Sequence, residues 1–288
     1  MDPLKAAAEA ALGMRVRRLQ PVLGGDINEA YRISAADGQD YFLKTHQNPP
    51  EDLYTREAEG LNWLREADAI RIPQCFHHSS RRGAEPALLI LEWIDSAPPC
   101  PNHDELLGRG LAKIHLKTEA EFGLPETNYI GSLHQRNRKH KTWHDFYTQE
   151  RLLPQFELAA RAGLVPSNLG KNFDTLLGRI GDILGPEEPP SRLHGDLWGG
   201  NTIRDEKGEP CLIDPAIYAG HREVDLAMMQ LFGGFNPRVF AAYEESYPTT
   251  EGSAGRIPLY QLYYLLVHLN LFGSSYLSAV HRAVDCYS

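Results

Sequence analysis

The stretch HGDLWGGN at 194–201, followed by LIDP at 212–215, decides how this chain is interpreted. It places an acid, an amide and a second acid, Asp196, Asn201 and Asp214, in that order. Phosphoryl transfer from ATP needs oxygen-bearing groups of this kind, one to orient the attacking hydroxyl and two to hold magnesium against the triphosphate. A lone Gly-Asp pair would be ordinary turn chemistry. The full arrangement is more specific and favours a kinase-type site.

The segment between these residues predicts why they would meet. Residues 201–214 are typical of a strand, a turn at 205–208 and a second strand, with Pro210 at the start or edge of that strand. An antiparallel hairpin returns its end beside its beginning. We therefore expect Asn201 and Asp214 at its open end.

Composition and charge exclude several classes of protein. The chain has 288 residues and a formal net charge of −9, which argues against nucleic acid as a partner because phosphate binding usually needs a basic surface. The start carries no apolar run typical of a signal peptide. The apolar stretch 259–277 contains polar residues and indicates a buried helix, so no membrane partner is expected. Four cysteines without metal spacing favour reduced thiols and a cytoplasmic location.

The order of expected elements indicates an α+β fold with two lobes. Residues 1–95 predict a small β-rich nucleotide-binding lobe, and residues 96–288 a larger, mainly helical lobe for catalysis and substrate binding. Strands are expected at 22–23, 30–33, 41–44 and 87–91, and helices at 5–12, 53–67, 106–117, 143–161, 169–183, 224–232, 238–245 and 259–281.

Lys44 and Glu57 form the second candidate group. Lys44 ends an expected strand and Glu57 lies on the following expected helix. A lysine that contacts the phosphates and is held by a helical glutamate is the other half of a kinase-type nucleotide site. Two exposed surface residues are the simpler alternative. Glu59 is a competing partner, but it points to a different face of the helix.

Two further segments could contact the nucleotide through their backbones. The turn Gly24, Gly25, Asp26, Ile27 and Asn28 could lay N–H groups over phosphates, although it matches no standard phosphate-binding motif and a plain hairpin turn is the equal alternative. The segment from Leu91, including Glu92 and Ile94, could offer backbone groups to adenine, or it could simply be the end of a buried strand.

Three features remain open between a functional and an ordinary reading. Asp225 is either a buried support for the catalytic loop or an exposed acid in the first turn of a helix. Trp198 is either part of the core or a flat wall against a sugar. The basic run 136–141 favours a solvated loop, with attraction of an anionic substrate as the alternative.

These residues resemble the fructosamine kinase, or ketosamine 3-kinase, family, a branch of the aminoglycoside phosphotransferase-like, protein-kinase-like fold. The resemblance covers nearly the whole chain from Gly24 onward, and its most specific parts are the tryptophan in the catalytic loop and the continuation GHREVDLAM. The matching segments are GGDINEAYRI at 24–33, FLK at 42–44, EAEGL at 57–61, LLILEWI at 88–94, LGRGLAKIH at 107–115, FGLPETNYIGS at 122–132, HGDLWGGN at 194–201 and LIDPAIYAGHREVDLAM at 212–228.

The resemblance implies an activity and roles for individual residues. ATP would donate its γ-phosphoryl group to the 3-hydroxyl of a ketosamine, a sugar adduct on an amine or protein, and the phosphorylated adduct would then release the amine. Asp196 would be the catalytic base, Asn201 and Asp214 the Mg2+ ligands, and Lys44 with Glu57 the phosphate-binding pair. A monomer is expected.

Two alternatives keep part of this interpretation. A kinase for another small alcohol, of the aminoglycoside or choline type, would share the chemistry and differ in the acceptor. An ATP-binding pseudokinase would bind nucleotide without turnover. The intact polar set described above argues against the second alternative.

Overall fold

Two compact units make up the chain in the computed structural model, which describes residues 3–22, 29–81, 83 and 85–287. The first unit contains Met1–His103 and Thr202–Pro215, and the second contains Asp104–Asn201 and Ala216–Ser288. The hairpin expected at 201–214 therefore belongs to the first unit, because its backbone bonds to residues far earlier in the chain. The Leu212 N–H donates to the Arg71 carbonyl at 3.0 Å and the Ala97 N–H to the Asp205 carbonyl at 3.1 Å. As functional lobes, the ranges 1–95 and 96–288 stay a prediction.

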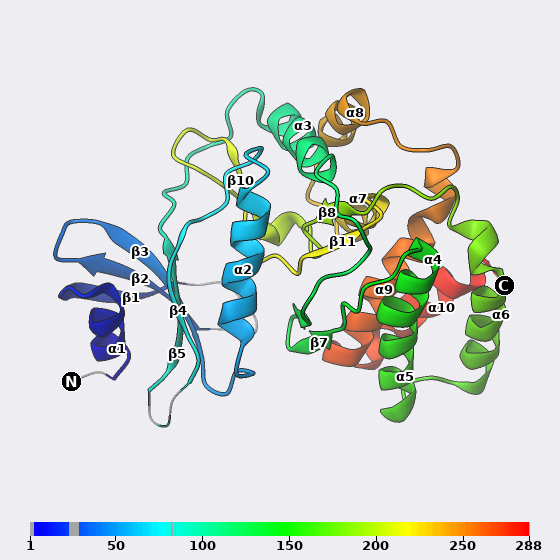
Figure 1. The fold of residues 1–288 in the computed structure, drawn as a ribbon, viewed down its shortest axis with the longest axis horizontal. Helices are drawn as coiled ribbons and strands as arrows, with labels where there is room; N and C mark the ends of the chain where they lie inside the picture. Colours follow the sequence, from blue (N-terminus) through cyan, green and yellow to red (C-terminus); the bar gives the residue numbers. More distant parts are fainter. Residues whose placement is uncertain (1–2, 23–28, 82, 84, 288) are drawn as a thin grey trace. The chain divides into compact units, whose positions relative to one another are not determined.

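The first unit is built on an antiparallel sheet, with strands in the order β1-β2-β3-β5-β4 (Figure 1). Its elements are α1 (Pro3–Leu12), β1 (Val16–Val22), β2 (Glu29–Ala35), β3 (Asp40–His46), α2 (Leu53–Arg65), β4 (Cys75–Ser79), β5 (Ala87–Glu92) and the hairpin β9 (Thr202–Arg204) and β10 (Pro210–Leu212). The strands expected at 30–33, 41–44 and 87–91 and the helices at 5–12 and 53–67 are confirmed. Most of β1 and all of β4 were not expected from the sequence. Both strands contain many polar residues, so neither shows the apolar pattern of a strand.

Alternating side chains of the sheet form the core beneath α1. Ile33 on β2, Leu43 on β3 and Ile90 on β5 pack with Ala8 of α1, and all four are fully buried. Strand side chains alternate between the two faces of a sheet. Leu89 on β5 is nevertheless also fully buried, which agrees with helices on both faces, α1 on one and α2 on the other (Figure 1).

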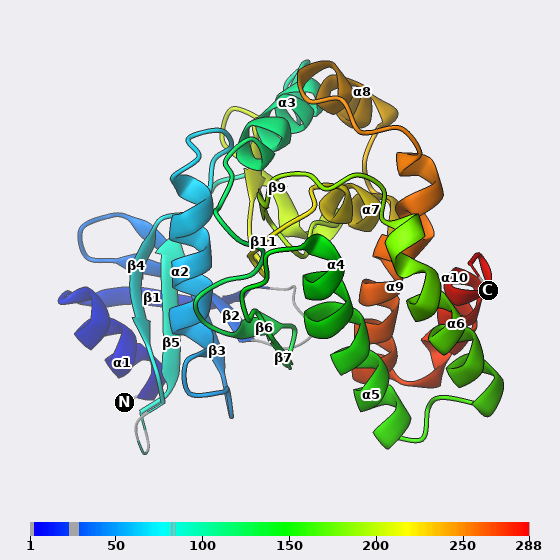
Figure 2. The ribbon, with the colours of Figure 1, turned by 45° about the vertical axis from the view of Figure 1, so that its right-hand side comes forward.

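The second unit is mainly helical and surrounds α9 (Ser253–Phe272), which lies among α5, α7 and α10 (Figures 1 and 2). Its other elements are α3 (His103–His115), β6 (Asn128–Ile130), β7 (Leu133–Gln135), α4 (Trp143–Phe146), the π-helix η1 (Tyr147–Leu152), α5 (Leu153–Arg161), α6 (Ser167–Ile183), β8 (Ser191–Leu193), η2 (Gly199–Asn201), β11 (Tyr218–Gly220), α7 (Glu223–Leu231), α8 (Pro237–Ser246), η3 (Ser274–Tyr276) and α10 (Leu277–Asp285). Within the described part of the chain, no helix combines the length and the apolar character needed to cross a membrane.

The single helix expected at 259–281 is wrong, because the chain forms two helices there. α9 ends at Phe272, and Gly273 follows with a φ of +80°, a backbone conformation that L side chains rarely adopt. A short 3-10 turn then leads into α10. The apolar periodicity continues through both helices, so the pattern alone did not mark the break.

The Tyr287 hydroxyl replaces a backbone hydrogen bond that is missing in α9 next to a proline inside the helix. Pro258 has no N–H and disturbs the ladder around it. The Leu259 N–H donates to the Tyr287 hydroxyl at 3.1 Å, and that hydroxyl donates to the Gly255 carbonyl at 2.6 Å. The hydroxyl thus relays the bond that a regular helix would make directly between Leu259 and Gly255.

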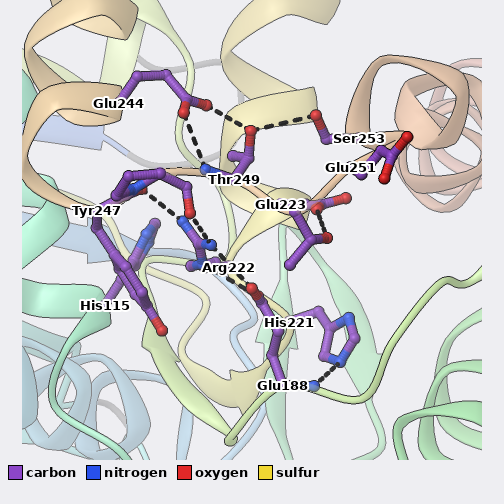
Figure 3. A network of polar contacts seen from close by, with 12 residues as sticks. His115, Glu188, His221, Arg222, Glu223, Glu244, Tyr247, Thr249, Glu251 and Ser253 are labelled. Carbon is purple, nitrogen blue, oxygen red and sulfur yellow. Dashed lines mark hydrogen bonds and ion pairs between the residues drawn. The ribbon is translucent and has the colours of Figure 1, made fainter.

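A buried polar network joins the start of α7 to the loop before β8 (Figure 3). The Arg222 guanidinium donates to both carboxylate oxygens of Glu188, at 2.8 and 3.0 Å, and to the carbonyls of Tyr247 and Pro248. His221 stacks on Trp143 with ring centroids 4.9 Å apart. The network anchors α7 through a nearly fully buried arginine, whose charge is compensated by a carboxylate, as burial requires.

His221 is held as a neutral ring. Its Nε2 lies 3.1 Å from the backbone N–H of Glu188 and must accept from it, and its Nδ1 lies 3.3 Å from the Tyr260 hydroxyl. Burial, reinforced by the charges of Arg256 and Arg222, lowers the pKa of His221 from 6.5 to about 3. Between these two values the unfolded chain binds a proton at His221 that the folded protein does not. Stability from this residue is therefore lost as the pH falls below about 6.5.

We predict that His221→Gln, which keeps an acceptor but does not titrate, removes this part of the pH dependence. When the pH falls from 7 to 5, the unfolding free energy of the wild type should decrease by about 2 kcal/mol more than that of the variant. Urea unfolding at both pH values measures it. A difference that stays constant with pH would contradict the assignment.

Candidate active site

Lys44 lies between two carboxylates in the first unit. It is carried by β3, and its Nζ is 2.9 Å from Glu57 Oε1 and 3.0 Å from Asp214 Oδ1. α2 places Glu57 on the same face as the buried residues Tyr54 and Leu61, because these positions recur at helical spacing. Asp214 follows β10, which pairs with β9 in the hairpin. The fold therefore brings together three of the residues that the sequence analysis singled out.

Glu59, the competing partner for Lys44, points elsewhere. Its carboxylate is 3.0 Å from Arg56 on the same helix, and the side chain is 56% exposed. Two positions along a helix turn a side chain to another face, so only one of the two glutamates can reach β3.

The charge states of this group follow from its burial. Burial by itself disfavours the charged form of Lys44, but the carboxylates of Asp214 and Glu57 outweigh it and raise the pKa of Lys44 above its usual range. Burial raises the pKa of Glu57, opposed by Lys44 and reinforced by Asp214. Lys44 is thus a permanent cation, and two acids share it.

Asp214 has a backbone conformation that is uncommon for its residue type. Its φ is +52°, in the left-handed region, which aspartate tolerates better than most residues. It also precedes Pro215, which further restricts the backbone. Such conformations persist where the surroundings enforce them and often occur at functional sites. The contact with Lys44 is one such restraint.

In the second unit, Asn201 contacts Asp196 directly. Asn201 lies in η2 at the end of the loop, and its Nδ2 donates to the Asp196 backbone carbonyl at 2.8 Å and to the Asp196 carboxylate at 3.1 Å. With its NH2 directed at Asp196, the amide turns its oxygen away from that carboxylate. Asn201 is buried and Asp196 is half-buried, so the amide restricts the orientation of a carboxylate that solvent still reaches.

Asp225 is buried and braces the loop that carries Asp196. Its carboxylate accepts the backbone N–H groups of His194 at 2.8 Å and Gly195 at 2.9 Å. Its Oδ2 also lies 3.1 Å from His115 Nε2, and His115 Nδ1 lies 2.8 Å from the Tyr243 hydroxyl. Of the two alternatives left open by the sequence, this is the geometry of a buried support.

Glycine is required at position 195 of this loop. Its φ is +80°, and a Cβ there would lie 2.0 Å from the Ala216 carbonyl oxygen. The Gly195 carbonyl in turn accepts the Tyr264 hydroxyl at 2.9 Å. Any larger residue would push the loop off its support.

Trp198 lies at the surface of its unit, with 41% of the side chain exposed. Its ring folds back over Gly200, where an added Cβ would lie 2.3 Å from the ring. This explains the glycine at position 200 and leaves part of an aromatic side chain accessible to a ligand. Contact with a sugar stays a prediction.

The remaining nucleotide candidates are only partly described. Gly24, Gly25, Asp26, Ile27 and Asn28 lie outside the described residues.

At the end of β5, the Glu92 N–H already donates to the Gln74 carbonyl at 2.8 Å, and the Glu92 carboxylate lies 2.6 Å from Arg71. A role in binding adenine would therefore rest on the Glu92 carbonyl and on the backbone of Ile94, which is half-buried.

A buried amide network, which was not expected from the sequence, contacts the backbone of Ala216 and Ile217. Gln135 Nε2 donates to the Ala216 carbonyl at 3.0 Å, and Asn128 Nδ2 donates to the Ile217 carbonyl at 2.9 Å. Tyr263 donates its hydroxyl to the Gln135 side chain at 2.7 Å. Buried amides of this kind follow no periodic pattern, and only the place of Asn128 in the NYIGS segment, with Gln135 shortly after it, could have suggested a role.

The basic run 136–141 is not simply a solvated loop. Arg136 and His140 both lie against the carboxylate of Glu150, at 3.2 and 3.1 Å, and that carboxylate is fully buried. The exposed guanidinium of Arg136 thus compensates the buried carboxylate of Glu150, and this contact joins the run to η1.

The chain is similar to known proteins over nearly its whole length. The family model described as fructosamine kinase matches residues 4–287. The chain is 38% identical over 266 residues to a probable ketoamine kinase of Enterococcus faecium, covering 92% of this chain and 93% of the relative.

Two solved structures give the fold. The crystal structure of a putative fructosamine-3-kinase from Thermobifida fusca is similar with a TM-score of 0.89 at 35% identity, covering 99% of this chain and 98% of that one. A choline kinase from Streptococcus pneumoniae is similar with a TM-score of 0.63 at 16% identity, covering 98% and 96%, which shows a shared fold. This chain therefore belongs to the fructosamine kinase family of phosphotransferases and has the protein-kinase-like α+β fold.

Proposed function

We propose that this phosphotransferase moves the γ-phosphoryl group of ATP to the 3-hydroxyl of a ketosamine, a deglycation repair activity that frees the glycated amine. The observation that carries the proposal is Lys44 held between Glu57 and Asp214, which is the arrangement of a kinase nucleotide site. The relative in Enterococcus faecium, named a probable ketoamine kinase, supports the acceptor class. The protein acts as a cytoplasmic monomer in this proposal.

Asp196 is the catalytic base in this mechanism. It accepts a hydrogen bond from the sugar hydroxyl and takes its proton late in the transfer. Because the transition state of phosphoryl transfer is loose, the base contributes mainly by holding the nucleophile in line. The contact from Asn201 Nδ2 and the bracing of the loop by Asp225 supply the rigidity which that positioning requires.

Lys44 offsets charge on the phosphates of the donor. Its positive charge is held on strand β3 by the two carboxylate partners. Backbone N–H groups of Gly24–Asn28 would cover the phosphates, and the backbone at Glu92 and Ile94 would contact adenine.

Asn201 and Asp214 would hold a magnesium ion. The fit rests on their donor atoms, an amide oxygen and a carboxylate, which are the hard ligands that this ion accepts. Asp214 is well placed for it, because 41% of its side chain is exposed despite the contact with Lys44. When bound, the ion neutralises charge on the phosphates.

Trp198 provides a flat surface for the sugar. Its ring is accessible from solvent and is carried two residues after Asp196 on the same loop. Aromatic rings commonly present an apolar face to ligands while polar neighbours fix their orientation.

The acceptor is tested by a substrate panel. With Mg-ATP and ribulosamines, erythrulosamines, fructosamines, aminoglycosides and choline, we expect ADP release and loss of the adduct for at least one ketosamine. A coupled ADP assay and mass spectrometry of the adduct measure this. Turnover only on another alcohol would replace the acceptor, and ATP binding without any turnover would indicate a pseudokinase.

Asp196→Asn tests the base. The variant should lower kcat by about 10²-fold or more, because a positioned general base is lost. Binding of ATP should stay within about threefold of wild type, since Asp196 does not bind the donor. Steady-state kinetics and an ATP titration measure the two effects. Comparable losses in both would refute the role.

Glu57→Gln and Glu59→Gln form a matched pair on the same helix. Each removes one negative charge, but only Glu57 contacts Lys44, and Glu59 contacts Arg56 instead. The KM for ATP should rise by about tenfold in Glu57→Gln, because a charged hydrogen bond contributes about 1.5–3 kcal/mol. Glu59→Gln should behave like wild type. Equal effects of the two substitutions would contradict the assignment.

A further inference from the structure

Four aromatic side chains form a continuous strip on the surface of the second unit. Phe232 follows α7, His268 and Phe272 are carried by α9, and Tyr276 lies in η3. Ring centroids are 4.7 Å apart between Phe232 and His268, 5.4 Å between His268 and Phe272, and 5.0 Å between His268 and Tyr276. We call these four residues the aromatic strip, and His268 is its centre.

Two of the four rings of the strip are exposed to solvent. Phe232 is 39% and Phe272 is 49% exposed, whereas Tyr260, Tyr263 and Tyr264, on the same helix as Phe272, are buried. Contiguous apolar surface that stays open to solvent is typical of a binding surface.

The aromatic strip is linked to the loop that carries the catalytic Asp196 through Tyr264, a buried residue on the same helix as His268. The Tyr264 hydroxyl donates to the Gly195 carbonyl at 2.9 Å, and His268 Nδ1 lies 2.8 Å from the Tyr264 carbonyl. Positions four apart on a helix share a face, so Tyr264, His268 and Phe272 form one row. With a rise of 1.5 Å per residue, the row is about 12 Å long from Tyr264 to Phe272.

A second contact ties the other end of the aromatic strip to the same loop. Phe232 precedes Gly233 and Gly234, and a Cβ added to Gly199 would lie 3.4 Å from Gly234 Cα. Gly199 directly follows Trp198. The segment that follows Phe232 and the loop that carries Trp198 are therefore in backbone contact.

His268 presents a neutral ring with an acceptor. A carbonyl can only accept, so Nδ1 carries the proton that is donated to Tyr264, and Nε2 has the lone pair. Burial lowers the pKa of His268 below its usual value of 6.5, which keeps the ring uncharged near neutral pH. The strip therefore has no positive charge of its own, and ring faces together with an imidazole lone pair attract ammonium groups.

We propose that the aromatic strip is the subsite for the amine-side substituent of the ketosamine and that it favours the alkylammonium stem of a glycated lysine side chain. The proposal rests on the proposed function. In a ketosamine the nitrogen is attached to C1, close to the C3 hydroxyl along the sugar chain, so a sugar placed at Asp196 must direct its substituent out along the neighbouring surface. The protonated nitrogen then meets the ring faces, and the methylene groups pack along Phe232 and Phe272.

The test compares two adducts of one sugar, the one turned over best in the substrate panel. One is formed on the side chain of Nα-acetyl-lysine amide and has a long stem, and the other is formed on methylamine and has almost none. For Phe272→Ala and Phe232→Leu, the ratio of kcat/KM for the lysine adduct to that for the methylamine adduct should fall by about two- to fivefold, because both adducts carry the same protonated nitrogen and only the lysine adduct loses apolar contact of its methylene groups. The fall should appear mainly in KM, because the strip does not touch the reacting atoms.

Phe76→Ala is the matched control. It removes a phenylalanine that is 45% exposed, but in the first unit on β4, and it should leave the ratio unchanged. Thermal unfolding of each variant checks that the fold is intact.

An unchanged ratio in both strip variants, with the wild type active on both adducts, would overturn the subsite and leave the proposed function standing. Equal losses for the two adducts would also overturn it, because a merely structural role predicts that result. A wild type inactive on both adducts would instead refute the proposed function, and the subsite with it.

Discussion

One buried carboxylate, that of Asp225, holds the loop that carries Asp196 in place. It accepts two consecutive backbone N–H groups, from His194 and Gly195, and is itself backed by His115. A charge taken fully out of water is costly unless donors surround it, and two backbone N–H groups left without an acceptor would be costly as well. The carboxylate therefore needs the two N–H donors, and the donors need the carboxylate. The conformation of Gly195, which no other residue type could adopt there, is part of the same constraint.

The support for Asp225 extends well beyond its own helix. His115 contacts Tyr243, and Tyr243 contacts Arg222. Arg222 in turn contacts Glu188 (Figure 3). Buried polar networks of this kind are stable only when their members are satisfied, and they then specify one arrangement of the surrounding helices. Residues from α3, α7 and α8 thus support the loop that carries Asp196.

In the first unit, the corresponding constraint is a buried positive charge, that of Lys44. Lys44 is a buried cation shared by two acids, and the shared contact fixes a strand, a helix and the end of the β9–β10 hairpin at one point. A lysine held in this way keeps its charge and its position before any ligand binds. Preorganised charge is what a site for phosphoryl transfer needs, since catalysis there depends on positioning and electrostatics.

Local pattern in the sequence determined the hairpin at 201–214, most of the helices and the pairing of Lys44 with Glu57 in preference to Glu59. These features depend on spacing within a strand or a helix, which a short segment encodes by itself. Tertiary structure alone decided the partners of Asp225, the buried amides Asn128 and Gln135, and the exposure of Phe232 and Phe272. It also placed the hairpin in the first unit. Those outcomes depend on which distant segments come to lie in contact, and burial or hydrogen bonding across such distances leaves no periodic trace along the chain.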